Sequence, residues 1–445
     1  MGTTPGKRVL VIQFGMIGSI LKATLRKVAP ASALAAVLLF AIPLGTEHLR
    51  QLYGSWNLLS DGTIAPSGTV DFYAYWGAFQ AQKRGLNPYD PGSLERMRSF
   101  AGLSLAGTNY YWNPPWLLVL AAPVLNLPFE KSASLWMLLS ILLSILSAVL
   151  MWASQNGQPP FLIPCVVAGT CFYPMLETLY WGQVGALVTL GVAGFVWATW
   201  CRRDLLAGSF LILASLKPHL LYLFFVVVAY WVIVERRYRV LVGTFAAGAS
   251  LGILVWLWAP DVFQHWLGNS ARSWEHISTR KSANLVGFTR GLISDFTGSA
   301  PSWLLVAIPI ISVLACLAWL LLIRKRIEWG RDLAPVLCCS VFTAPYGWSH
   351  DHLVLSLVQV TTIGLVFGGD IEGSKQRMIC LHWLAFQLLV LGLSFSFRPA
   401  FQFSWFPLGV FLLWLTSSSY LSEQATSGKC RADWMQPQNQ AFRQE

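Results

Sequence analysis

Two ionisable residues of this sequence stand where group transfer at a membrane surface could take place. Asp71 lies among aromatic residues directly after the first long apolar run. A carboxylate at the mouth of a helix bundle can act as a general base towards a hydroxyl group. Lys217 interrupts an apolar stretch next to Pro218, and an ammonium there can hold a phosphate. Two alternatives stay open: Asp71 caps the following helix, or Lys217 snorkels to water.

Further polar residues are candidates for binding a sugar or an anion. Gln183 follows Trp181 and Gly182, and its amide can hydrogen-bond sugar hydroxyls or make an interhelical contact. Asn284 and Arg290 lie in a long polar segment and offer additional donors. For basic residues of such a segment, solvated loop charge is the alternative interpretation.

The triplet His350-Asp351-His352 stands near the end of an apolar run. It could suggest a metal site, but neighbouring residues point in different directions and the spacing presents no third ligand. We therefore predict no metal. An imidazole that orients a substrate is the preferred role for His350, and His219 is of interest because it borders Lys217.

The composition indicates a polytopic α-helical membrane protein. The chain has 445 residues, of which 55% are hydrophobic and only 11% charged, with a mean hydropathy of +0.54. Its net charge of +11 comes from short basic clusters between apolar runs, which are typical of topology signals rather than of nucleic-acid binding. The eight cysteines form no CxxC pair, so neither a disulfide framework nor a zinc site is predicted. No nucleotide-binding motif is present, and no cofactor is expected.

About twelve membrane-length apolar runs are expected to position these residues. They lie near 28–47, 133–152, 161–177, 184–201, 205–217, 219–235, 240–259, 302–323, 333–346, 352–368, 378–396 and 405–420. The predicted domains are a cytoplasmic segment at 1–27, one membrane domain over 28–420 with outer loops at 48–114 and 260–301, and a polar cytoplasmic tail at 421–445. The short run near 115–127 is predicted to be a re-entrant or partly inserted helix, because a full span there would break the alternation of sides.

The basic clusters fix which ends of the runs share a side. Arg202-Arg203 and the cluster from Glu235 to Arg239 are expected to be cytoplasmic. Segments 178–183, 217–219, 260–301 and 344–352 then lie together outside with the loop 48–114. The sequence therefore predicts that Asp71, Gln183, Lys217 and His350 converge on one outer cavity.

Several short motifs in this order resemble glycosyltransferase family 87, of the C-type glycosyltransferase superfamily. They are Asp71 after the first run, Gly85-Leu-Asn-Pro-Tyr-Asp90, Tyr111-Trp-Asn-Pro-Pro115, Gly182-Gln183, Lys217-Pro218, Asn284 to Arg290 and Trp348-Ser-His350. The resemblance covers about 28–420. The chain departs from the family pattern in Asn113 before the proline pair and in the second histidine, His352.

The resemblance implies a transferase in the bacterial inner membrane with its site on the extracytoplasmic side. Its donor would be a polyprenyl-phosphate sugar, most often mannose, and its acceptor a lipid or glycan. The implied catalytic residues are Asp71 as base and His350. We predict that Lys217, Arg290 and His219 bind the donor phosphate, and that Gln183, Asn284, His352 and Tyr75 bind the sugar or acceptor.

The departing phosphate is already a stable anion, so one base suffices, and a single displacement predicts inversion at the anomeric carbon. The competing hypothesis is a secondary transporter or lipid flippase. That class needs a polar path through the bundle and often two similar halves, whereas the ionisable residues here gather at one side.

Overall fold

The computed structural model describes residues 56–58, 64–66, 70–103, 110–155, 157, 162–269, 282–323, 326–368, 373–396 and 403–426. The predicted segment 1–27, the first apolar run and all of the tail beyond 426 lie outside the described residues. The described chain is helical apart from β1 (Trp56–Leu58) and β2 (Ile64–Pro66), which pair antiparallel with Asn57 opposite Ala65. The predicted all-α class therefore holds with the exception of this short hairpin.

The chain from residue 70 to residue 258 supplies eleven of the helices that the structure describes. They are α4 (Val70–Lys83), α5 (Pro91–Phe100), α6 (Trp116–Leu120), α7 (Ala122–Leu125), α8 (Phe129–Ser154), α9 (Leu162–Thr170), α10 (Tyr173–Trp181), α11 (Gly185–Trp200), α12 (Asp204–Ala214), α13 (Tyr222–Val234) and α14 (Arg239–Trp258). The second half adds α16 (Leu285–Thr297), α17 (Leu304–Ile323), α18 (Trp329–Thr343), the 3₁₀ helix η2 (Ser349–Leu355), α19 (Ser356–Gly368), α20 (Gly373–Ser396) and α21 (Phe406–Thr426).

Membrane-spanning helices are fewer among the described residues than the apolar runs suggested. Four are long and apolar enough, and the pair α9 and α10, bent by 54°, makes a fifth if it is one broken span. Five shorter apolar helices account for other runs. The count of twelve is not confirmed, because hydropathy measures the length of an apolar run, whereas turns and prolines divide several runs into shorter helices.

The short run near 115–127 forms α6 and α7, which are separated at Ala121. Each is far shorter than the roughly 20 residues that a helix needs to cross a bilayer. Pro115 precedes α6, and Pro123 lies in the first turn of α7. The run therefore forms short helices, as predicted, and its partial insertion into the membrane stays a prediction.

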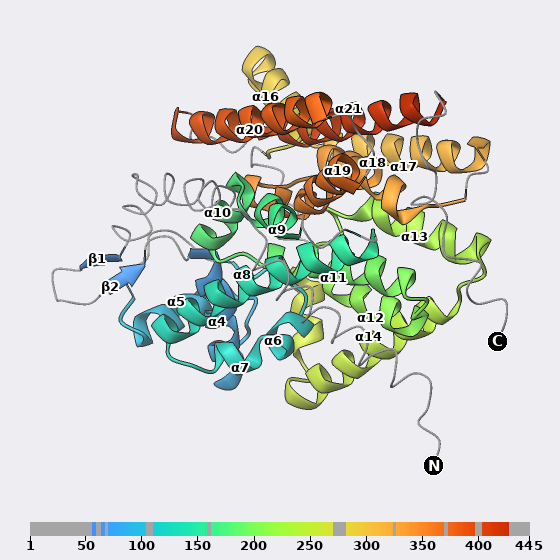
Figure 1. Cartoon of the computed structure of the whole chain (residues 1–445). Coiled ribbons are helices and arrows are strands. Elements are labelled where there is room, and N and C mark those ends of the chain that lie inside the picture. Colours follow the sequence, from blue (N-terminus) through green and yellow to red (C-terminus); the bar gives the residue numbers. More distant parts are fainter. Residues whose placement is uncertain are drawn as a thin grey trace.

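The helices pack into one bundle around α11 (Figure 1). α11 lies between α8 and α12, and α12 also packs along α14. Small residues permit this close approach: a Cβ atom on Gly208 of α12 would come within 2.0 Å of the Val240 carbonyl oxygen of α14. η2, from late in the sequence, packs against α10 and α11. This contact brings the His-Asp-His triplet beside the turn that carries Gln183.

The turn between α10 and α11 depends on Gly182. This residue ends α10 in the left-handed conformation, with φ of 68°. Its carbonyl oxygen accepts a hydrogen bond from Trp136 Nε1 at 2.9 Å. A Cβ atom at this position would lie 2.5 Å from the Cβ atom of Phe72 on α4. The glycine thus lets the next residue, Gln183, approach the first turn of α4.

Replacing Gly182 with alanine is expected to destabilise the protein by about 2–4 kcal/mol, because a left-handed alanine and a clash with Phe72 add together. Gly85→Ala is the matched control: Gly85 also has a φ of +68°, but nothing lies within 4 Å of an added Cβ atom. That variant should lose only about 1 kcal/mol. Denaturant or thermal unfolding in detergent micelles measures both, and equal losses would contradict the close approach.

Candidate functional site

α4 carries Asp71 in its first turn. The amide groups at a helix N-terminus favour a negative charge, so this is a suitable place for a carboxylate. The following residues are buried and anchor the helix: the Phe72 ring lies 5.6 Å from Trp136, and the Tyr73 hydroxyl donates to the Leu94 carbonyl oxygen at 2.5 Å. Asp71 itself is only partly buried. The carboxylate is therefore held on a rigid helix and remains accessible.

Gln183 connects Asp71 to the rest of the site. Its Nε2 donates to Asp71 Oδ2 at 2.5 Å. Its Oε1 accepts from Lys217 Nζ at 2.8 Å and from the Tyr75 hydroxyl at 3.1 Å. The donors and acceptors fix the orientation of the amide, because only the nitrogen can donate to a carboxylate. The Gln183 side chain thus lies between the Asp71 carboxylate and the Lys217 ammonium and bonds to both.

Lys217 lies in the turn between α12 and α13, where its ammonium forms an ion pair with Asp351 Oδ1. Both side chains are buried, with 10% and 6% of their surface exposed. Asp351 Oδ2 accepts the Trp348 backbone N–H at 2.8 Å, which holds the carboxylate in its own turn. The interpretation of Lys217 as a residue snorkelling to water does not fit this buried pair.

His350 completes the group. Its Nε2 lies 3.6 Å from Asp351 Oδ1, and its backbone carbonyl accepts from Thr178 Oγ1 of α10 at 3.2 Å. Asp71, Gln183, Lys217, Asp351 and His350 are hereafter the site cluster. Its members come from α4, the α10–α11 turn, the α12–α13 turn and η2. The predicted convergence of distant segments is therefore present in the structure.

His219, predicted to bind the donor phosphate, borders the site cluster as a neutral group. Its ring stacks on Tyr346 with centroids 3.9 Å apart, and its Nδ1 lies 3.1 Å from the Tyr346 hydroxyl. Burial lowers the pKa of His219 to about 3, with Asp351 raising and Lys217 further lowering the pKa. The imidazole is uncharged at neutral pH, so it can contribute hydrogen bonding but not a positive charge.

Asn284 and His352 lie beside the site cluster, and their side chains hydrogen-bond to backbone groups. Asn284 caps α16: its Oδ1 accepts the Gly287 N–H at 2.9 Å, and its Nδ2 donates to the Ala344 carbonyl oxygen at 2.9 Å. His352 Nε2 lies 2.9 Å from the Ala283 carbonyl oxygen. These contacts give both residues structural roles, and their predicted binding of sugar or acceptor stays a prediction.

Arg290 lies farther along α16 and is buried. Its Nε donates to the Pro301 carbonyl oxygen at 3.2 Å. The guanidinium is thus engaged at the connection between α16 and α17. Its predicted phosphate contact stays a prediction.

Two acidic residues of the site were missed. Asp351 was weighed only as a metal ligand, although its position between two histidines was a signal. Glu177 of α10 was not considered. Its carboxylate accepts from Tyr173 at 2.5 Å, Trp181 at 2.9 Å and Ser349 at 3.3 Å. A single acidic residue at the end of an apolar run was the available signal, and its contact with Ser349 fixes the start of η2.

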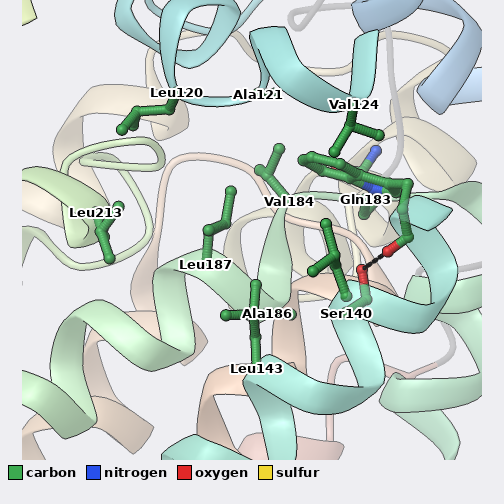
Figure 2. A pocket seen from close by; sticks show the side chains of 12 residues that line it. Leu120, Ala121, Val124, Ser140, Leu143, Gln183, Val184, Ala186, Leu187 and Leu213 are labelled. Atoms are coloured by element: carbon green, nitrogen blue, oxygen red, sulfur yellow. Dashed lines mark hydrogen bonds between the residues drawn. The ribbon is translucent and has the colours of Figure 1, made fainter. Parts of the chain in front are cut away.

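A mainly apolar cavity of about 130 Å³ adjoins the site cluster. Figure 2 shows Gln183 at one side of this cavity and Leu213 at another, with Ala186 and Leu187 of α11 between them. The walls come from α6, α7, α8, α11 and α12. Six of the lining residues are Leu120, Val124, Trp136, Ser140, Leu187 and Leu213. The cavity is suited to hydrocarbon and has one amide at its edge.

A family model for glycosyltransferase family 87 matches residues 111–346, more than half of the chain. The chain belongs to glycosyltransferase family 87. No match was found among curated proteins or among solved structures. The family membership and the apolar helices make the protein a membrane glycosyltransferase, and they decide against the transporter or flippase hypothesis. The matched residues include Gln183 and Lys217, whereas Asp71 and His350 lie outside them.

Proposed function

We propose that this protein transfers a hexose, mannose in the first instance, from a polyprenyl phosphate to a hydroxyl group of a lipid or glycan acceptor. The observation that carries the proposal is the chain of hydrogen bonds through Gln183, with the Asp71 carboxylate at one end and the Lys217 ammonium at the other. This arrangement offers a base and a phosphate-binding cation at the same site, one amide apart.

The proposed reaction is a single displacement. Asp71 accepts the proton of the acceptor hydroxyl as its oxygen attacks the anomeric carbon. The bond from that carbon to the phosphate oxygen breaks, and polyprenyl phosphate leaves with the bonding electrons. The Lys217 ammonium stabilises the negative charge on the phosphate. Nucleophile and leaving group occupy opposite faces of the sugar, so the configuration at the anomeric carbon inverts.

The neighbouring apolar cavity supports a lipid-linked donor. It lies next to Gln183 and is lined mainly by aliphatic side chains. A prenyl chain beside the phosphate would bury hydrocarbon there, at about 25 cal/mol per Å² of apolar surface removed from water. A nucleotide sugar has no such chain and would gain no binding free energy from these aliphatic side chains.

The helix directions support a site on the extracytoplasmic side of the inner membrane. α11 runs from Gly185 to Trp200, so Gln183 and Arg202 lie at its opposite ends. α12 likewise separates Arg203 from Lys217. Basic turns favour the cytoplasm. The other ends, which carry the site cluster, then face outwards.

Transfer assays test the proposal. Purified protein in proteoliposomes is given synthetic polyprenyl-phosphate mannose with labelled sugar and a membrane-lipid extract, with nucleotide-linked mannose as a parallel donor. Label should pass to an acceptor from the polyprenyl donor only, with inversion seen by NMR. Transfer only from polyprenyl-linked arabinose, galactose or glucose would correct the sugar. Transfer from the nucleotide donor, or from none, would overturn the donor class.

A further inference from the structure

Lys217 alone is poorly suited to stay in one place. Its side chain has four flexible carbon bonds and the ammonium has three rotatable N–H donors. It is also buried, with 10% of its side chain exposed, where an ammonium without a counter-ion is strongly disfavoured. A phosphate-binding ammonium at this position therefore needs a fixed anion beside it when the donor is absent.

Asp351 supplies that anion from a rigid turn. One carboxylate oxygen pairs with Lys217, while the other accepts the Trp348 N–H at 2.8 Å. The turn is held on two further sides. Thr178 of α10 donates to the His350 carbonyl oxygen at 3.2 Å, and His352 lies 2.9 Å from the carbonyl oxygen of Ala283 at the start of α16.

The ammonium has one more N–H donor than the two acceptors that hold it. Two of its three N–H groups are directed at Asp351 Oδ1 and Gln183 Oε1. The third can donate to an anion without breaking either bond. Gln183, which accepts a hydrogen bond from this ammonium, also lines the neighbouring apolar cavity.

We propose that Asp351 is a positioning residue that acts through Lys217: it keeps the ammonium charged and aimed at the phosphate of the lipid donor. This inference rests on the proposed function, in which Lys217 binds that phosphate. Asp351 does not touch the donor. The opposite possibility is that Asp351 competes with the phosphate for Lys217, and it predicts an effect of the opposite sign.

Binding of tritiated decaprenyl phosphate to the full-length protein, measured by scintillation proximity in detergent micelles, tests this inference. Asp351→Asn should raise the Kd about tenfold, which corresponds to the loss of one charge-assisted hydrogen bond. The KM for the polyprenyl-phosphate sugar should rise in parallel, with a much smaller change in kcat. The control is Asp204→Asn, which breaks the 2.9 Å ion pair with Arg237 at the opposite end of α12 and should leave the Kd unchanged.

A double-mutant cycle shows whether Asp351 acts through Lys217. Lys217→Gln should weaken binding by itself, and adding Asp351→Asn should then have no further effect. The double variant also guards against misfolding, because it leaves no unpaired buried charge. Unchanged or tighter binding by Asp351→Asn, or additive losses in the cycle, would overturn the positioning role.

The outcomes separate this inference from the proposed function. If Lys217→Gln binds decaprenyl phosphate as well as the wild type does, the phosphate role of Lys217 in the proposed function is wrong, and the inference falls with it. If Lys217→Gln weakens binding and Asp351→Asn does not, only the inference is wrong.

Discussion

Replacing Asp71 with asparagine is expected to lower the transfer rate about thousandfold, within the range that general bases contribute. Asparagine has nearly the same shape and can still bond to the amide of Gln183, but it cannot accept the proton of the acceptor hydroxyl. The loss should fall on kcat, because Lys217, the proposed phosphate-binding group, lies at the other end of the hydrogen-bond chain. Rates of label transfer at saturating donor measure it.

Asp90→Asn is the matched control for this variant. Asp90 is another aspartate close to Asp71 in the sequence and caps α5, with its Oδ2 accepting the Ser93 N–H at 2.9 Å. Asparagine is also a good N-cap, so this variant should fold and retain full activity. The variant Asp71→Asn should bind decaprenyl phosphate as the wild type does. If Asp71→Asn transferred sugar at the rate of Asp90→Asn, the base would have to be another residue.

The meeting of Asp71, Gln183, Lys217 and His350 could be predicted from the sequence because it follows from topology. Gln183, Lys217 and His350 stand at the ends of apolar runs and Asp71 in the loop after the first run, and the basic clusters predict which ends share a side. The predicted alternation of helices across a bilayer then places these ends together. This reasoning needs no side-chain geometry, which explains why it brings these four residues together but does not find Asp351.

The sequence could not show which polar side chains would be occupied by hydrogen bonds to the backbone. Asn284 was a candidate for sugar binding, but the start of α16 and the Ala344 carbonyl use both ends of its amide. The partner of Lys217 was equally hidden, because the ion pair with Asp351 joins residues 134 positions apart. Such pairings depend on the turn of η2 and on its packing against α10, which no local pattern encodes.

The number of spans was harder to predict than the position of the site. Apolar runs are continuous across α9 and α10, although the chain bends by 54° between them. Pro174 lies in the first turn of the second helix of this pair, which begins at Tyr173, and a proline lacks the N–H that would continue the first helix. The bend lets α10 pack against η2. The feature that makes the number of spans hard to predict therefore helps to position the site residues.

Gln183 joins the two charged ends of the site, and its replacement by leucine is expected to reduce kcat/KM about a hundredfold. Leucine fills a similar volume but removes the hydrogen bonds to Asp71 and Lys217. A hydrogen bond to a charged group contributes about 1.5–3 kcal/mol. Losing the bond to Asp71 frees the base to turn, and losing the bond to Lys217 leaves Asp351 as the ammonium's remaining partner in the site cluster, so kcat should fall and the donor KM should rise together.

The control for this variant is Gln359→Leu, which removes another buried glutamine. Its Oε1 accepts from Trp383 and Gln387, both at 3.3 Å, in the packing of α19 against α20. This variant measures the effect of losing a buried amide outside the site cluster, and its transfer rate should stay within about twofold of the wild type. In the variant that carries both Asp71→Asn and Gln183→Leu, the losses should not add, because the two residues form one hydrogen-bonded unit. Strictly additive losses would mean that Gln183 binds the sugar independently of Asp71, and the hydrogen bond between them would then have no part in the reaction.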